Sequence, residues 1–233
     1  MNWFTQTFSS TIGKKVLVAL TGLALVGFLI AHLAGNLLIF APSGEGRATG
    51  MDDYAHALHE IPVLPLAELG LVVFFVLHVG LVLQLWADNR KARGGSYAVS
   101  ASKRPKGPVA RLASGTMIVS GLVVLAFIPL HIWDFRLRRS EVHGPGATEE
   151  ISALVIETLS SPLHGGFYIV ASLLIGWHLF HGIHSAIRSI GFHHPKYTPI
   201  IEKVGFALSA LLAVGFASIP LAILLGALEA GGN

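Results

Sequence analysis

The sequence contains no cysteine and few charged residues. Without cysteine the chain forms no disulfide, uses no thiolate in catalysis and binds no iron–sulfur cluster through cysteine. Charged residues make up 12% of the chain, whereas soluble domains carry about a quarter. The mean hydropathy is correspondingly high, at +0.67. This composition indicates an integral membrane protein.

Five long apolar runs account for the composition. They cover residues 16–40, 66–87, 110–133, 166–190 and 200–228, and a helix needs about 20 residues to cross a bilayer. Runs such as LGLVVFFVLHVGLVLQLW lack the alternation of a barrel strand. The first run is longer than the apolar part of a signal peptide, so we expect it to stay in the mature protein. The sequence therefore predicts an all-α protein, one domain over residues 1–233 with five transmembrane helices.

The positively charged residues predict how this bundle is oriented, because cytoplasmic loops are rich in Lys and Arg. We expect the N-terminus in the cytoplasm and the C-terminus outside, in the cell inner (cytoplasmic) membrane. The basic segment 91–108 is then a cytoplasmic loop able to contact a partner or anionic headgroups. Nucleic-acid binding is not expected, because the basic residues lie between apolar runs. Of the 16 Lys and Arg residues, all but Arg47, Arg136, Arg138 and Arg139 fall in inner segments.

Histidine is the unusual polar residue of the apolar runs. His32, His78 and His131 lie in the first three spans, and the fourth contains GWHLFHGIHSAIR, residues 176–188, with His178, His181 and His184. One such histidine is commonly a core residue bonded to a backbone carbonyl, yet ionisable groups inside spans are functional candidates by default. Four successive spans that each offer one favour a functional set. Beyond this recurrence no internal repeat is evident.

The depth of each histidine follows from the rise of a helix, about 1.5 Å per residue. His32 and His131 lie roughly 24 and 31 Å from the inner ends of their helices, whereas His78 and His178 lie roughly 13 and 18 Å from theirs. We call His32 and His131 the outer pair, and His78 with its fourth-span partner the inner pair. Depth does not choose between His178 and His181, which lies at about 13 Å. Gly182, four residues after His178, favours His178, although the small Ser185 follows His181 at the same spacing.

Two pairs of neutral imidazoles at two depths match the axial ligands of two haem groups, since the macrocycle fills the other positions on each iron. Zinc would require three or four ligands at one depth, and a proton relay would require acids among the histidines. The sequence therefore predicts two stacked b-type haems that carry electrons across the membrane. His184 and Arg188, nearest the cytoplasmic headgroups, would either contact haem propionates or form an ordinary cationic helix end.

The four histidine contexts AHLAGN, FVLHVGL, LHIWDFR and WHLFHGIHSAI resemble those of a known family. This is the diheme cytochrome b membrane anchor, of the five-helix type, of succinate:quinone oxidoreductase (complex II) and fumarate reductase. The resemblance covers nearly the whole chain. It implies that His32 and His131 bind the distal haem iron, and that His78 and the fourth-span histidine bind the proximal one.

The resemblance also implies an activity and partners. A flavoprotein subunit oxidises succinate, an iron–sulfur subunit passes the electrons on, and this anchor delivers them to a membrane quinone, with menaquinone the expected species. The chain has neither cysteine nor a dinucleotide-binding fingerprint, so FAD and iron–sulfur clusters would belong to those partners. If the quinone site is on the outer side, as the resemblance implies, its proton donors are sought among His59, Glu60, Glu68 and Asp134.

Two other functions remain open at this point. A diheme cytochrome b of a hydrogenase or formate dehydrogenase would use the same ligands with different soluble partners. A histidine-lined metal or proton transporter without haem would have broken helices and acids near the middle of the membrane. Pro129 and Pro220 are the only prolines well inside the spans, which gives a transporter little support.

Overall fold

The protein is described by a computed structural model that covers residues 6, 10–45, 47–93, 112–113, 115–138 and 151–229. Five of its helices are long and apolar enough to cross a membrane, and no strand occurs among the described residues. The prediction of an all-α protein with five membrane-spanning helices is confirmed. These helices are α2 (Thr11–Leu37), α4 (Leu64–Arg93), α6 (Met117–Ile132), α9 (Pro162–Ser189) and α10 (Thr198–Leu224).

The observed helices differ from the predicted spans mainly at their ends. α9 begins earlier, at Pro162, because proline is well suited to the first position of a helix. α10 ends at Leu224, four residues short of the prediction, where Gly226 adopts a left-handed conformation with φ of 72°. α6 begins at Met117, and residues 110, 111 and 114 of its predicted span lie outside the described residues, as do residues 94–108 of the predicted cytoplasmic loop.

Two short helices that the sequence did not reveal lie at one end of the bundle. α3 (Gly50–His59) and α8 (Ile151–Leu159) are too short to register as membrane spans. The buried carboxylate of Asp52 joins them, because it accepts hydrogen bonds from the backbone N–H of Ser152 at 2.9 Å and from its hydroxyl at 2.6 Å. A carboxylate at the N-terminus of a helix also suits the helix dipole.

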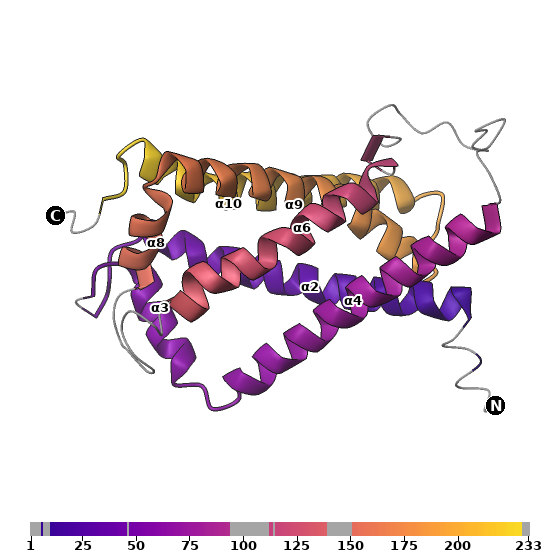
Figure 1. Cartoon of the computed structure of the whole chain (residues 1–233), viewed down its shortest axis with the longest axis horizontal. Helices are drawn as coiled ribbons and strands as arrows, with labels where there is room; N and C mark the ends of the chain where they lie inside the picture. Colours follow the sequence, from indigo (N-terminus) through magenta and orange to yellow (C-terminus); the bar gives the residue numbers. More distant parts are fainter. Residues whose placement is uncertain are drawn as a thin grey trace.

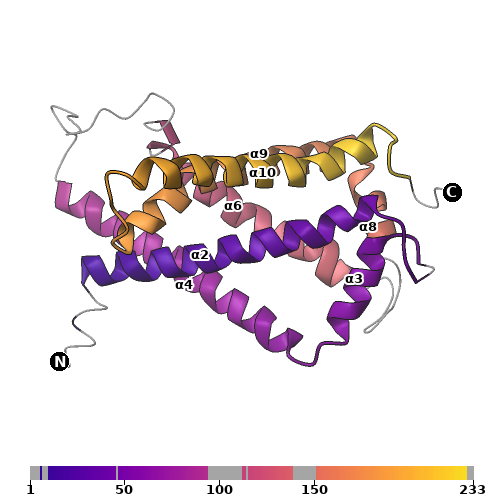
Figure 2. The same ribbon diagram turned by 180° about the vertical axis from the view of Figure 1, so that it is seen from behind.

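The five long helices run alternately up and down along the long axis of the molecule (Figures 1 and 2). α2 and α10 begin, and α4 and α9 end, at the end that carries Lys14, Lys15, Arg90, Arg188 and Lys203, which we call the basic end. The opposite end carries α3 and α8, and we call it the α3–α8 end. The basic end is the one predicted to face the cytoplasm, and that orientation stays a prediction.

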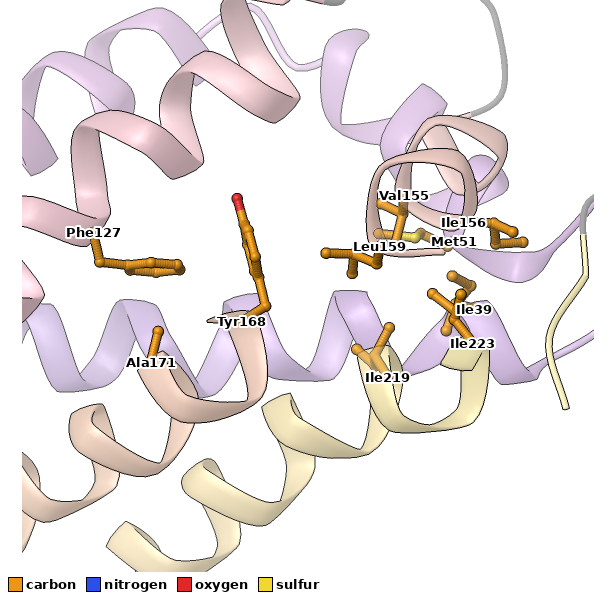
Figure 3. Close-up of a cluster of buried hydrophobic side chains, with 10 residues drawn as sticks. All are labelled: Ile39, Met51, Phe127, Val155, Ile156, Leu159, Tyr168, Ala171, Ile219 and Ile223. Atoms are coloured by element: carbon orange, nitrogen blue, oxygen red, sulfur yellow. The ribbon is translucent and has the colours of Figure 1, made fainter. Parts of the chain in front are cut away.

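α9 is the central helix of the bundle, since it packs against α10, α2 and α6. α4 lies at the periphery, with α2 as its main neighbour in the described part of the chain. Two clusters form the apolar core. One lies in the middle of α2, α9 and α10 and includes Leu33, Leu179 and Leu212. The other lies toward the α3–α8 end, from Phe127 and Tyr168 to Ile39 and Ile223 (Figure 3).

The contact between α9 and α10 depends on Gly176. A Cβ atom at this position would overlap the Cβ of Ala213 and lie 3.0 Å from the carbonyl oxygen of Ser209. Small residues at such crossings let two membrane helices approach closely. By contrast, a Cβ atom on Gly166 of the same helix would meet nothing within 4 Å.

We therefore expect Gly176→Ala to destabilise the bundle by about 1–3 kcal/mol, the usual effect of overpacking. The matched change Gly166→Ala should leave stability unchanged or raise it by up to about 1 kcal/mol, because alanine favours helix. Thermal unfolding of the detergent-solubilised protein, followed by circular dichroism, measures both. Equal midpoints for the two variants would contradict the assigned α9–α10 packing.

Candidate functional site

The outer pair meets inside the bundle. His32 on α2 and His131 on α6 have ring centroids 5.8 Å apart, with the ring planes nearly perpendicular at 88°. Each imidazole lies against the phenylalanine four residues before it: Phe28 stacks on His32 at 5.1 Å, and Phe127 lies 5.5 Å from His131. Residues four apart share one face of a helix, which explains why each phenylalanine lies beside its histidine. They flank the two imidazoles with apolar rings.

His78 of the inner pair is held by α2. Its Nδ1 lies 3.2 Å from the carbonyl oxygen of Val18 and 3.3 Å from the hydroxyl of Thr21. His178 is held by α6 in the same way, with Nδ1 3.2 Å from the hydroxyl of Ser120 and within reach of the Met117 carbonyl.

These hydrogen bonds determine which nitrogen of each inner imidazole carries the proton. The hydroxyl of Thr21 donates to the Leu17 carbonyl at 2.8 Å, and that of Ser120 donates to the Met117 carbonyl at 3.0 Å. A hydroxyl has one proton to donate, so toward the imidazole each oxygen acts as an acceptor. Nδ1 is therefore the N–H donor, and Nε2 of each ring keeps a free lone pair. Metal-binding histidines are commonly oriented by such a second bond.

Two glycines make room for this arrangement. A Cβ atom on Gly22 would lie 3.0 Å from Cε1 of His78, and one on Gly121 would lie 3.2 Å from Cε1 of His178. Both distances are tighter than ordinary van der Waals contact. The glycines thus serve the histidine rings as well as the packing of helices. We call Val18, Thr21 and Gly22 the α2 seat, and Met117, Ser120 and Gly121 the α6 seat.

The seats reveal an internal repeat that the histidines alone did not show. The segment TGLALVGFLIAH of α2 aligns with SGLVVLAFIPLH of α6. The halves α2–α4 and α6–α9 also run in the same directions. The counterparts on α6 lie 99 residues later in the sequence: Met117 for Val18, Ser120 for Thr21, Gly121 for Gly22, Phe127 for Phe28 and His131 for His32. The counterpart of His78 is His178, which lies 100 residues later.

The outer pair fits two ligands of one metal ion. A metal–imidazole bond is about 2 Å long, which places two such nitrogens about 4 Å apart and the ring centroids about 6 Å apart. The observed centroid separation is 5.8 Å. Nδ1 of His131 is buried without a hydrogen-bond partner among the described residues, so this ring is not an ordinary hydrogen-bonded core histidine. The amide nitrogen of Asn36 lies 3.4 Å from Nδ1 of His32.

The chemistry of the inner pair suits metal binding, because the hydrogen bonds leave the Nε2 lone pair of each ring without a proton. In the described part of the chain no three His, Asp or Glu side chains form a group able to hold a metal ion. The roles of these histidines as haem ligands stay predictions.

The other histidines of α9 have different surroundings. His181 is half-buried and interacts electrostatically with His178. Nε2 of His184 lies 3.5 Å from the carboxylate of Glu202 at the start of α10. Nε of Arg188 is buried and has no hydrogen-bond partner among the described residues. His178 is thus the α9 histidine that a seat orients, and Arg188 is a cation available to an anionic group near the basic end.

The four predicted quinone-site candidates lie toward the α3–α8 end but are not alike. His59 and Glu60 are exposed at the end of α3. Glu68 is exposed on α4 and pairs with Arg136 at 3.4 Å. Asp134 is buried in the π-helical turn η2 (Trp133–Leu137) that follows α6. Of the four, only Asp134 lies inside the bundle.

Comparison with protein-family models, with curated proteins and with solved structures finds no match to this chain. What can be argued about its function therefore depends on its residues and their geometry.

The α2 seat gives a test of the inner pair with a control on the same helix. Gly22→Leu should push the His78 ring off its hydrogen bonds with Val18 and Thr21, because the added atoms occupy the place of the ring. Gly27→Leu should not, because a Cβ atom there meets nothing within 4 Å. If the inner pair holds a haem as predicted, purified Gly22→Leu protein should carry half the haem of the unsubstituted protein, and Gly27→Leu protein the full amount, as counted by pyridine haemochrome assay. Full haem content in both variants would show that the seat does not position a ligand.

Proposed function

We propose that this chain is the membrane anchor and electron-transfer subunit of a succinate:quinone oxidoreductase. The observation that carries this proposal is that four helices supply histidines at two levels: His32 lies against His131 with ring centroids 5.8 Å apart, and His78 and His178 are each hydrogen-bonded to a neighbouring helix. The outer pair is His32 with His131, and the inner pair is His78 with His178. Thr21 and His32 are eleven residues apart on α2, which separates the two levels by about 16 Å along the helix.

Each residue of the site has a role under this proposal. The four imidazoles would hold two b-type haems, which when bound supply one-electron redox centres at the two levels. The hydrogen bonds at the two seats engage Nδ1 of His78 and of His178, which leaves Nε2 as the nitrogen that would bind a metal. Arg188 and His184 at the basic end would face the propionates of the inner haem, because these are anionic groups that need cations or hydrogen-bond donors.

The rest of the reaction is assigned to partners. A flavoprotein subunit would oxidise succinate, and an iron–sulfur subunit would dock on the basic end and pass electrons to the inner level. The outer level would deliver them to a membrane quinone, with menaquinone the expected species. The continuous helices support this function over a transporter: α10 passes through Pro220 to Leu224, and the buried acids Asp52 and Asp134 lie toward the α3–α8 end rather than at mid-depth.

Alanine replacement of the two rival histidines tests the ligand assignment. His178→Ala should remove one of two haems, because His178 is the α9 histidine that the α6 seat holds and it would ligate the inner haem with His78. His181→Ala should keep both haems, because the α6 seat would still hold His178. Haem content and the reduced b-type absorption bands measure the outcome. Two haems in the His178→Ala protein would refute that assignment, and a colourless unsubstituted protein would refute haem binding altogether.

Purification from native membranes tests the partners. We expect an affinity-tagged form of this chain to bring with it a flavoprotein and an iron–sulfur protein, and the complex to reduce a quinone analogue with succinate as donor. A complex that instead oxidises hydrogen or formate would assign the chain to the other class of diheme cytochromes. Substituting the lysines and arginines of the basic end should weaken this association at low salt and have little effect at high salt, since salt screens exposed charges.

A further inference from the structure

Trp177 places an indole in the apolar span of α9, directly before His178, and this indole is hydrogen-bonded to α6. Its Nε1 donates to the hydroxyl of Thr116 at 2.9 Å. That hydroxyl donates its own proton to the carbonyl of Leu112 at 2.9 Å, so toward the indole it is an acceptor. An indole N–H can only donate, and lipid offers it no acceptor. Thr116 therefore satisfies a group that would otherwise lack a partner inside the bundle.

The bond lies one helical turn from the α6 seat. Thr116 and Ser120 are four residues apart on α6, so they share a face of that helix. Each of them meets one of two consecutive residues of α9, because Thr116 bonds Trp177 and Ser120 lies 3.2 Å from Nδ1 of His178. Two attachments about 6 Å apart along α6 limit both the slide and the rotation of α9 at the histidine.

This double attachment distinguishes His178 from His181. The two residues are three apart on one helix, so α9 would slide by about 4.5 Å and turn by about 60° to bring His181 to the place of His178. That motion would carry Trp177 away from Thr116 and leave its N–H without an acceptor. The Trp177–Thr116 bond thus opposes the register in which His181 faces Ser120.

Aromatic packing holds the Trp177 ring from a second direction. Its centroid lies 6.2 Å from that of Phe180, three residues further along α9, and Phe180 lies edge-on to Phe206 of α10 at 5.6 Å. α9 packs on both α6 and α10. The indole is therefore connected to α6 through its N–H and to α10 through Phe180, which makes it a fixed point of the α9 register.

The first half of the chain has no equivalent of this bond. The residue 99 positions before Thr116 is Leu17, and the residue 100 positions before Trp177 is Leu77. Neither leucine has a polar side-chain atom. α4 contains a single histidine, whereas α9 contains His181 as a rival to the one that meets the seat. The additional bond thus occurs in the half of the repeat where a choice between histidines has to be made.

We propose that Trp177 is a positioning residue of the inner pair, whose bond to Thr116 fixes the register of α9 that presents His178, and not His181, to the α6 seat. This inference depends on the proposed function, in which His178 is an iron ligand. Without the bond, α9 shifts at His178, the imidazole turns, and its N–H bond to Ser120 weakens. An imidazole with a weaker N–H bond is a less basic metal ligand.

The test compares Trp177→Phe and Thr116→Val with two matched controls, all in protein purified from membranes. Trp86→Phe removes an indole that is 45% exposed on α4, and Thr116→Ser keeps the hydroxyl. Electron paramagnetic resonance of the oxidised protein depends on the angle between the two imidazole planes at each low-spin iron. The inner-haem signal should shift in Trp177→Phe and Thr116→Val and stay in place in both controls. His178→Ala identifies the outer-haem signal as the one that remains.

Two further measurements separate positioning from a general loosening of the bundle. The midpoint potential of the inner haem should rise in Trp177→Phe, because a less basic ligand stabilises ferric iron less, whereas that of the outer haem should not change. In thermal unfolding, the double variant Trp177→Phe/Thr116→Val should lose clearly less stability than the sum of the two single variants, because each single change already removes the same bond.

An unshifted inner-haem signal and potential in Trp177→Phe would overturn the inference while the proposed function stands. Equal shifts in Thr116→Ser and Thr116→Val would overturn it as well, because the hydroxyl would then have no part in the effect. If Trp177→Phe does not fold, the two Thr116 variants decide alone. Two haems in the His178→Ala protein would refute the ligand assignment, and an unsubstituted protein without haem would refute the proposed function. In both of these cases the inference falls with its premise.

Discussion

The structure depends on how a polar imidazole is accommodated inside an apolar bundle. Each neutral ring has one N–H to donate and one lone pair to satisfy. In the inner pair, a backbone carbonyl and a hydroxyl on the neighbouring helix take the N–H of His78 and of His178. Because Thr21 and Ser120 direct their own protons at carbonyls, they accept from the ring and leave its second nitrogen for another partner. The glycine beside each hydroxyl is needed for the approach.

This arrangement occurs twice because the chain contains two related halves. The seats lie on α2 and α6, and the histidines that they hold lie on α4 and α9, so the inner pair consists of equivalent residues from the two halves. The outer pair, His32 and His131, also consists of equivalent residues from the two halves. The repeat places a histidine at the same position of α2 and α6, and another at nearly the same position of α4 and α9, which explains why the histidines lie at matching levels.

The symmetry is broken where the two halves have different neighbours. α10 has no counterpart in the repeat and packs against α9, so α9 becomes central while α4 keeps most of its surface outside the bundle. The two halves also differ in the residues beside the outer pair. Gly35, against which Tyr54 packs, occupies the place that Asp134 has in the second half. The second half therefore has a carboxylate, bonded to Tyr168 and 3.8 Å from His164, where the first half has a glycine.

The sequence alone was sufficient for the class of protein, the five spans and the depths of the histidines, because apolar run length and helical rise are local properties. It did not reveal α3 and α8, since helices this short have no long apolar run. It left His178 and His181 as rivals, because both occur at a suitable depth, and only the packing of α9 on α6 shows which ring meets Ser120 and Gly121. Glu68 and Asp134 were likewise equal candidates in the sequence. Tertiary structure distinguishes them, because burial and pairing depend on neighbours far apart in the chain: Arg136 holds Glu68 at the surface, whereas the π-helical turn directs Asp134 toward Tyr168.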